Sequence, residues 1–303
     1  MRTKYRTILI FTTLLTVCIT IAAIKIIKLE KKSQRVISNQ KIIIIKKTFN
    51  LPDILVETSG LIHYNHMVWS FNDSGGEPEI YSYSIADSSI KHRITLWNGK
   101  NYDWEEISQD SSFIYVGDFG NNFGIRNNLC IYIINKKQLP KHKNKAIKAR
   151  KIHFTYPGYS PTTFAFKRSA FDCEAMICFN DSIYLFTKNW ITNTSGIYQI
   201  PKEPGKYIAK KIGIFDSKGL ITAACLKKSQ LVLLGYANST PFIWRFNHFS
   251  NPNLKPYDGE RYDLKALNGK QTEGIAIIDS VTYLISSEKT TSFPQLFVVK
   301  IKP

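Results

Sequence analysis

The stretch WSFNDSGGEPEIYSYSI, residues Trp69 to Ile85, predicts two β-strands joined by a polar turn. Val68 to Phe71 are bulky and β-prone, Asn72 to Pro78 are turn formers, and Ile80 to Ile85 alternate bulky with small side chains. A hairpin alone is marginally stable in water, so it needs further strands to pack against. The rest of the chain supplies them by repeating the same pattern.

The pattern occurs five times. Each copy has a carboxylate or threonine, small residues, an apolar strand, a short turn and a second apolar strand. A third strand follows in every copy and a fourth in the first four. The copies begin at Glu57, Glu105, Glu174, Thr222 and Glu273, with spacings of 48, 69, 48 and 51 residues. Period-two alternation and β-branched residues argue against helices in these segments.

A four-stranded unit of about 40 to 50 residues, repeated around a ring, is typical of a β-propeller blade. The fifth copy lacks a fourth strand, and a spare strand lies before the first copy at Lys41 to Leu51. Pairing of this strand with the last blade removes the free sheet edge. The sequence therefore predicts an all-β, five-bladed propeller of four-stranded blades, closed by an N-terminal strand.

The net charge of +18 is concentrated in two segments. Residues 1–50 hold eleven Lys/Arg and one Glu, and the remaining +8 equals the eight basic residues of Lys136 to Lys151. The rest of the chain is therefore neutral, which argues against a general nucleic-acid-binding face. We expect the lysine-rich segment to be a solvated loop, with binding of an anionic partner as the alternative.

The N-terminus predicts membrane targeting. Basic residues in MRTKYR precede an uncharged run from Thr7 to Ile24. We assign residues 1–28 to a signal or membrane anchor, 29–40 to a basic linker and 41–303 to a single propeller domain. A segment at residues 7–27 that anchors or exports the domain predicts an extracytoplasmic location in the cell envelope. Its cleavage stays undecided. The four cysteines after Cys18 are expected to be small buried hydrophobes.

The propeller topology would gather acidic residues that are distant in sequence. The innermost strand of each blade faces the central channel, so the five repeat-start residues are expected around one opening. Turns between second and third strands, and loops leading into the inner strands, are expected at the rim of the same face. These rim residues are Asp73, Asp103, Asp118, Asn121, Asn122, Asp172, Lys188, Asn238 and Glu288.

Four carboxylates about 7 Å apart would repel by about 2.4 kcal/mol per pair at an effective dielectric constant of about 20. A divalent cation would compensate this repulsion, and oxygen ligands favour Ca²⁺ over zinc. We therefore predict a Ca²⁺ site whose ligands are Glu57, Glu105, Glu174 and Glu273. The alternatives are capping of backbone amides by these residues, a lysine counter-charge, and protonation of one or two of them.

Four phrases carry a resemblance to known proteins: NDSGGEPEIY, DWEEI with IYVGDFGNN, FDCEAM with IYLFTKN, and QTEGIAII with TYLISSE. They resemble envelope β-propellers of the esterase-like phytase and SdiA-regulated type, and more loosely calcium-binding lactonase propellers. The resemblance covers Glu57 to Lys302 and implies a propeller fold. Propellers of these families often have six blades, so six is the alternative to the five counted here.

The sequence contains no serine nucleophile elbow, HExxH, P-loop or GxGxxG motif. Catalytic residues are therefore not assigned. We expect a propeller that binds a ligand or partner on its acidic face with the help of a divalent cation. The alternative is a Ca²⁺-dependent hydrolase of phosphoesters or lactones, in which a carboxylate activates water.

Overall fold

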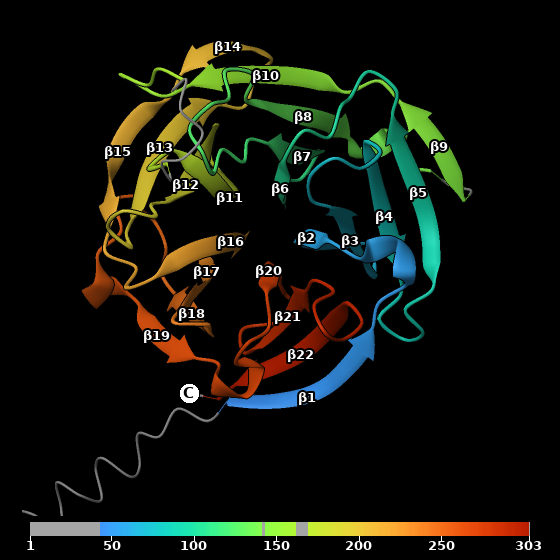
Figure 1. Ribbon diagram of the computed structural model, residues 1–303. Helices are drawn as coiled ribbons and strands as arrows, with labels where there is room; N and C mark the ends of the chain where they lie inside the picture. The colour runs from blue at the N-terminus through green and yellow to red at the C-terminus, as the bar shows by residue number, and fades with distance from the viewer. Residues whose placement is uncertain (1–42, 141–142, 162–168, 303) are drawn as a thin grey trace, which may run out of the picture. The chain divides into compact units, whose positions relative to one another are not determined.

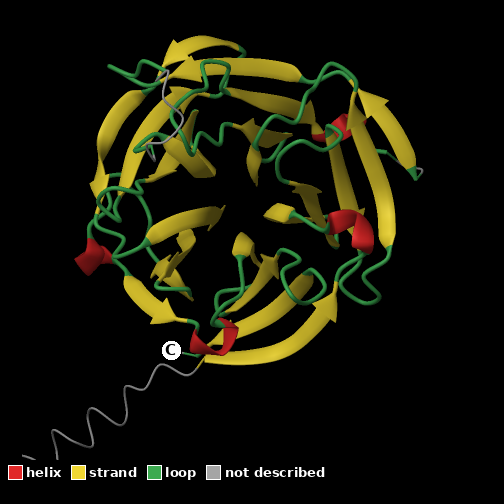
Figure 2. Cartoon of the chain, viewed as in Figure 1, coloured by secondary structure: helices red, strands yellow, loops and turns green. Residues whose placement is uncertain are grey.

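The computed structural model describes residues 43–140, 143–161 and 169–302, which contain 22 β-strands and four 3-10 helices of one turn. Strands dominate the picture in Figure 2, and the short helices lie between them. The predicted anchor, the basic linker and Cys18 lie outside the described residues. Within the described ranges, no helix is long and apolar enough to cross a membrane.

Five sheets stand around a common centre as the blades of a propeller, and the four strands that form each blade pair antiparallel (Figure 1). This confirms the predicted fold and the count of five. From the centre outward, blade 1 comprises β2 (Thr58–Tyr64), β3 (Met67–Asn72), β4 (Glu79–Tyr83) and β5 (Ile90–Leu96), and blade 2 comprises β6 (Trp104–Gln109), β7 (Phe113–Asp118), β8 (Cys130–Asn135) and β10 (Arg150–Thr155).

The other three blades repeat this arrangement. Blade 3 comprises β11 (Asp172–Phe179), β12 (Ser182–Lys188), β13 (Ser195–Pro201) and β15 (Lys210–Phe215), blade 4 comprises β16 (Leu220–Lys227), β17 (Gln230–Ala237), β18 (Thr240–Phe246) and β19 (Glu260–Asp263), and blade 5 comprises β20 (Thr272–Ile277), β21 (Thr282–Ser287), β22 (Gln295–Ile301) and β1 (Ile43–Asn50). The 3-10 helices are η1 (Asp53–Leu55), η2 (Lys136–Gln138), η3 (Pro256–Asp258) and η4 (Lys265–Leu267).

The turn that joins β2 to β3 shows how local sequence forms these blades. Asn65 and His66 both adopt positive φ angles, 50° and 61°. Two such residues form the type I′ turn whose twist matches that of the flanking strands, and asparagine tolerates the left-handed conformation well. The hairpin is therefore directed by its own turn residues.

The ring is closed as predicted by pairing of the first and last strands. β1 runs antiparallel to β22, with Ile43 opposite Ile301 and Asn50 opposite Gln295. The spare strand thus becomes the fourth strand of blade 5, and β22 has no free edge.

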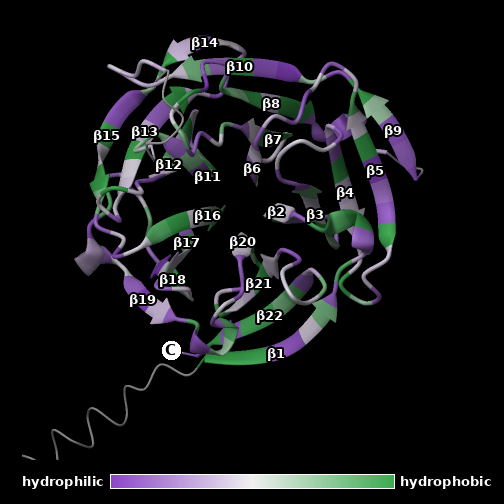
Figure 3. Cartoon of the chain, viewed as in Figure 1, coloured by the Kyte–Doolittle hydropathy of each residue, from purple (hydrophilic) through white to green (hydrophobic). Residues whose placement is uncertain are grey.

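Two blades carry a fifth strand that the repeat did not reveal. β9 (Asn144–Ile147) pairs parallel to β5 of blade 1, although it lies in sequence between two strands of blade 2. β14 (Gly205–Ile208), from blade 3, likewise pairs parallel to β10 of blade 2. The expectation of a solvated loop in the lysine-rich segment is therefore wrong at β9, whose backbone pairs with the edge of β5. Figure 3 shows the body of β9 as hydrophilic.

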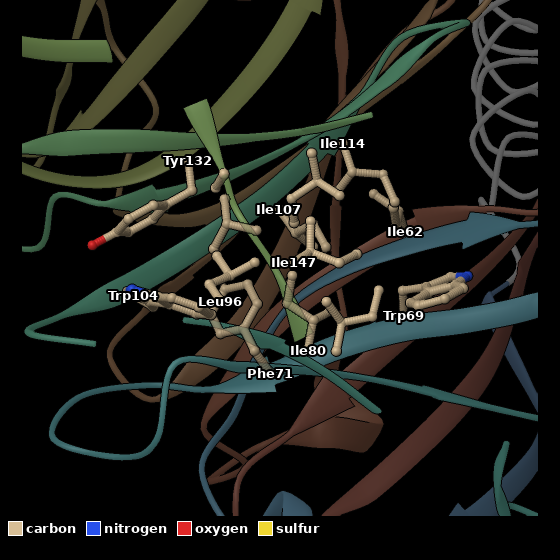
Figure 4. Close-up of a cluster of buried hydrophobic side chains, with 14 of the residues drawn as sticks. Ile62, Trp69, Phe71, Ile80, Leu96, Trp104, Ile107, Ile114, Tyr132 and Ile147 are labelled. Atoms are coloured by element: carbon tan, nitrogen blue, oxygen red, sulfur yellow. The ribbon is translucent and has the colours of Figure 1, made fainter. Parts of the chain in front are cut away.

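Apolar side chains fill each gap between neighbouring blades, and each of the five gaps holds its own cluster. The gap between blades 1 and 2 contains Trp104, which is fully buried and packs edge-on against Phe71 with ring centroids 5.4 Å apart. Ile147 of β9 lies among the side chains of both blades in Figure 4. The fifth strand therefore joins two blades.

The cysteines of the described residues are free thiols, as expected. Cys130 and Cys173 are buried, while Cys178 and Cys225 are half-buried. Burial raises the pKa of the Cys130 thiol to about 12, so it remains a protonated, apolar group in the core.

Candidate functional site

A β-bulge in the innermost strand directs the repeat-start residues of blades 2 to 5. The register with the second strand shifts around Glu105, Glu174, Thr222 and Glu273, and leaves each of them as the extra residue. A bulge turns its extra side chain away from the regular ladder, and bulges are frequent beside active sites. Blade 1 differs, because its bulge falls between Ser59 and Ile62. Glu57 is exposed in the turn before β2.

The ends of these inner strands surround a cavity of about 400 Å³. It lies on the face where second strands lead into third strands, which we call the cavity face. Its lining is rich in carboxyl groups and comes from every blade. The lining residues are Asp73, Glu105, Asn122, Glu174, Lys188, Trp190, Tyr236, Ser239, Gly269, Lys270, Gln271, Glu273 and Glu288.

Three carboxyl groups form what we call the acidic cluster: Asp73, Asp103 and Glu105. One oxygen from each lies within 4.8 Å of the others. Asp73 Oδ1 is buried and has no hydrogen-bond partner. Gly120 lies against the same group, since a Cβ at this position would collide with the carboxylates of Glu105 and Asp103. The cluster therefore occupies a recess that only a glycine leaves open.

Residues behind the cluster hold it in place. The Asn101 side-chain amide donates hydrogen bonds to the backbone carbonyls of Asn72, at 2.9 Å, and of Asp73. Asp118 Oδ1 accepts a hydrogen bond from the Asp103 backbone N–H at 3.1 Å and an ion-paired hydrogen bond from Arg126 at 2.7 Å. The positions of Asp73 and Asp103 are thus fixed by neighbours rather than by mutual contacts.

The environment of the acidic cluster disfavours negative charge when no cation is bound. Burial, followed by the charges of Asp103 and Glu273, raises the pKa of Asp73 to about 8. Burial raises the pKa of Asp103 to about 6, although Arg126 opposes this shift. Burial and the Glu174 charge raise the pKa of Glu105 well above its usual value. A cation would supply the missing counter-charge.

The other side of the cavity is arranged around a buried lysine. Lys188 Nζ lies 2.9 Å from Glu174 Oε1. It also lies 5.0 Å from the centre of the Trp190 ring and 5.7 Å from that of Tyr236, within range of cation–π attraction. Burial alone would lower the pKa of Lys188, but the charges of Glu174 and Glu273 outweigh it and raise that pKa well above normal. Lys188 is therefore a permanent cation.

Two further carboxyl groups of the lining have raised pKa values. Burial raises the pKa of Glu273 to about 7, while the Lys188 charge limits the shift. Burial and the charges of Glu273, Asp73 and Glu57 raise the pKa of Glu288 to about 9. The cavity therefore contains groups that gain or lose a proton in the physiological range.

The predicted rim residues divide into three groups. Asp73, Asn122, Lys188 and Glu288 line the cavity, and Asp103 belongs to the acidic cluster. Asp118, Asn121 and Asp172 are buried behind it, and each is engaged in internal hydrogen bonds. Asn238 lines a separate pocket at blade 4.

The predicted cation ligands are also divided. Glu105 lies in the acidic cluster, whereas Glu174 and Glu273 line the cavity near Lys188. Glu57 is exposed and is not part of the cavity lining. Asp73 and Asp103, which the sequence placed at the rim, take the remaining positions in the cluster.

Capping of backbone amides by a glutamate does occur, but the glutamate is Glu106, the residue after the repeat-start residue Glu105. Glu106 is completely buried, and its Oε2 accepts a hydrogen bond from the Ala224 backbone N–H of blade 4 at 2.7 Å. Its Oε1 accepts from the Ile107 N–H at 2.9 Å. Glu106 therefore links the inner strands of blades 2 and 4 across the ring centre.

Several residues of the cavity lining were not predicted from the sequence, because the repeat does not mark their positions. Trp190 follows the predicted rim residue Lys188 by two positions, and Tyr236 precedes Asn238 by two. Lys270 and Gln271 lie in the connection from blade 4 to blade 5. The signal that could have identified Lys270 and Gln271 is their position directly before the inner strand β20 of blade 5.

The donor set of the acidic cluster fits a hard divalent cation. Ca²⁺ binds oxygen at 2.3–2.6 Å, so two oxygens on one ion are at most about 5 Å apart. The 4.8 Å limit within the cluster satisfies this condition. All three donors are carboxylate oxygens, which suit Ca²⁺, Mg²⁺ or Mn²⁺ better than zinc.

Comparisons with known proteins support the fold. No family model matches the chain, and no curated protein sequence matches it. Among solved structures, the glutaminyl cyclase of Myxococcus xanthus aligns with a TM-score of 0.52 at 10% identity, covering 87% of this chain and 98% of its own. The PQQ-bound aldose sugar dehydrogenase of Streptomyces coelicolor aligns with a TM-score of 0.51 at 7% identity, covering 87% and 99%.

A protein assigned as a gluconolactonase aligns with a TM-score of 0.46 at 7% identity, covering 87% of this chain and 93% of its own. At these identities the likenesses concern the propeller fold alone, which several unrelated activities share.

Proposed function

We propose that this propeller binds a divalent cation, preferentially Ca²⁺, at the acidic cluster and uses it to bind a ligand in the cavity. One observation carries the proposal: Asp73, Asp103 and Glu105 offer oxygens within 4.8 Å of one another, and Asp73 Oδ1 is buried without a partner. Burial of such an atom is costly unless something compensates it. A cation bound by all three residues would do so.

The cavity suggests how a ligand is held. Ca²⁺ takes six to eight oxygen ligands, so three carboxylates leave coordination positions for ligand oxygens. On the opposite side, Trp190 and Tyr236 offer ring surface beside Lys188. Residues on both sides therefore contribute to the binding of a ligand with polar groups.

Hydrolysis is the second candidate function, and Glu273 favours it. A general base works best with a pKa near the ambient pH, and the pKa of Glu273 is raised to about 7 inside the cavity. A bound divalent cation would polarise an ester or lactone oxygen, and Glu273 would accept the proton of the attacking water. This corresponds to the Ca²⁺-dependent hydrolase of phosphoesters or lactones that the sequence left as the alternative function.

We propose that binding takes place outside the cytoplasm, in the cell envelope. The support is the uncharged run from Thr7 to Ile24 behind a basic N-terminus, which is typical of export or anchoring.

Titration calorimetry with CaCl₂ tests the cation. We expect one site in the full chain, and at least a tenfold weaker affinity in Asp103→Asn. Asp87→Asn is the control, because Asp87 is an exposed turn carboxylate on another part of blade 1. Absence of binding of Ca²⁺, Mg²⁺ and Mn²⁺ by the wild-type chain would contradict the proposal.

A panel of phosphoesters and lactones, assayed with and without EDTA, tests the second function. Hydrolysis that EDTA abolishes and Glu273→Gln strongly reduces would support it. Absence of turnover with the cation bound leaves ligand binding as the function.

A further inference from the structure

The cavity face exposes large apolar side chains beside the acidic lining. We call five of them the collar: Ile54, Tyr102, Phe123, Ile191 and Phe293. Their exposed fractions are 42%, 50%, 51%, 72% and 55%. Folded proteins expose isolated apolar residues routinely, but a group gathered on one face usually marks an interaction surface.

Four of the five collar residues lie close in the chain to residues of the acidic cluster or of the cavity lining. Tyr102 precedes Asp103 of the acidic cluster, Phe123 follows Asn122 and Ile191 follows Trp190. Phe293 lies in the same β21–β22 connection as Glu288. The collar therefore comes from connections of four blades, 1, 2, 3 and 5, that end at the cavity.

Two contacts tie the collar to the acidic site in space. The Arg126 guanidinium lies 5.7 Å from the centre of the Tyr102 ring and 4.0 Å from the Asp103 carboxylate. The Ile54 carbonyl accepts a hydrogen bond of 2.6 Å from the side chain of Asn72, the residue before Asp73. The apolar surface and the acidic recess thus share the same supporting residues.

The charge of the lining selects the occupant. Five carboxyl groups, from Asp73, Glu105, Glu174, Glu273 and Glu288, face two amines, from Lys188 and Lys270. With Asp103 of the acidic cluster counted, a divalent cation added to these amines gives four positive charges against six carboxyl groups, and a further positive charge favours the ionised form of Glu273 and Glu288. An occupant with a positive charge complements this surplus of carboxyl groups.

The size of the surface indicates a macromolecule. A cavity of about 400 Å³ accommodates one large side chain or a small molecule. A small molecule inside it would leave a collar from four blades exposed to water. A polypeptide would bury both, because flanking residues cover the collar while one side chain enters the cavity.

We propose that the cavity face is a docking surface for a polypeptide that inserts a lysine or arginine side chain into the acidic cavity and covers the collar with apolar residues. The proposal deepens the function proposed above and rests on it, since it uses the same cavity. A central charged anchor surrounded by apolar contacts that exclude water is a common arrangement in binding hot spots.

Selection from a phage-displayed library of random nonapeptides on the full chain tests the proposal. We expect enrichment of sequences with one central lysine or arginine between apolar residues. Fluorescence anisotropy of the best synthetic peptide should show at least tenfold weaker binding when glutamine replaces its basic residue. Ile191→Ser and Phe293→Ser should each weaken binding by about three- to tenfold.

Tyr257→Ser is the matched control, because Tyr257 is 83% exposed but lies in η3, between the third and fourth strands of blade 4. It should leave peptide binding unchanged. Failure to enrich any sequence, enrichment of acidic peptides, or equal effects of Tyr257→Ser and Phe293→Ser would overturn the proposal. Calcium calorimetry on the same preparations separates the two claims, since cation binding that persists without peptide binding overturns the docking surface alone.

Discussion

Gly120 illustrates how the site depends on a single residue. A Cβ at this position would collide with the carboxylates of Asp103 and Glu105. We predict that Gly120→Ala folds but loses calcium binding at least tenfold, because two of the three ligands must move apart. Gly76→Ala is the control, since its added Cβ would meet only the Asn101 side chain at 3.8 Å. Calorimetry on both variants checks this, and unchanged affinity in Gly120→Ala would exclude the cluster as the site.

The two glutamates near Lys188 are predicted to respond oppositely to substitution. Glu174→Gln removes the partner of a buried lysine at 2.9 Å, and breaking a buried ion pair typically costs about 3–5 kcal/mol. Glu273→Gln removes a carboxyl group whose pKa burial raises to about 7, so at pH 8.5 without cations it should stabilise the chain. Urea denaturation in EDTA measures both changes. Destabilisation of similar size in both variants would contradict this division of roles.

At the residue scale, the sequence predicted which side chains gather at one end of the ring but not their tasks. The repeat places Glu105, Glu174 and Glu273 in equivalent strands, so their convergence follows from topology. The repeat cannot distinguish Asp103, a member of the acidic cluster, from Asp172, whose oxygens accept hydrogen bonds from the Asn121 backbone N–H and the Trp190 indole N–H. Such assignments depend on loop conformation, which periodicity does not encode.

At the scale of elements, β1 is the strand whose loss has the clearest consequence. A chain that begins at Leu51 would expose the edge of β22, which β1 covers from Gln295 to Ile301. Unpaired edges associate with one another. We predict that this chain forms oligomers or aggregates, whereas a chain that begins at Ile43 remains monomeric. Analytical ultracentrifugation compares them, and a monomeric short chain with an unchanged melting temperature would refute the role of β1.

β9 gives a second test at this scale. Ile147 is buried between blades 1 and 2, whereas Ala146 on the same strand is exposed. Ile147→Ala should lower the free energy of unfolding by about 2–4 kcal/mol, as expected for truncation of a buried isoleucine. Ala146→Ser should change it by less than about 0.5 kcal/mol. Denaturation curves provide both values, and equal effects would show that β9 does not join the two blades.

The elements differ in how far the sequence specifies them. The inner strands and their hairpins were predictable because each carries the repeat and its own turn residues. β9 and β14 were not predictable from the sequence, because each has only four residues. Each also lies in the chain between two strands of one blade but pairs with a strand of the neighbouring blade. Their pairing depends on an exposed edge that exists only once the neighbouring blade has formed.

At the scale of the whole molecule, the raised carboxyl pKa values make stability depend on pH. The pKa values of Asp73, Glu273 and Glu288 rise to about 8, 7 and 9 in the fold. A group with a raised folded pKa contributes stability below its unfolded pKa, and this is lost as pH rises through the folded value. In EDTA, the free energy of unfolding from urea titrations should therefore fall between about pH 4 and pH 9.

Calcium should counteract this loss, because its binding favours the ionised carboxylates. At a hundredfold excess over the dissociation constant, the gain is about 2.7 kcal/mol by mass action. Stability that rises with pH in EDTA would contradict the raised pKa values. A calcium effect of equal size at pH 4 and pH 8 would contradict carboxylate ligation.

The closure of blade 5 also sets the order of events during synthesis. β1 ends at Asn50, yet its partner β22 begins only at Gln295, so β1 is synthesised well before the strand it pairs with. At about 5–20 residues per second, the roughly 250 residues between them take about 12 to 50 s to translate. Blades 1 to 4 can assemble in that interval while β1 waits as an unpaired strand. A nascent chain thus carries β1 as an unpaired strand, able to associate with other exposed strands, until β22 has been made.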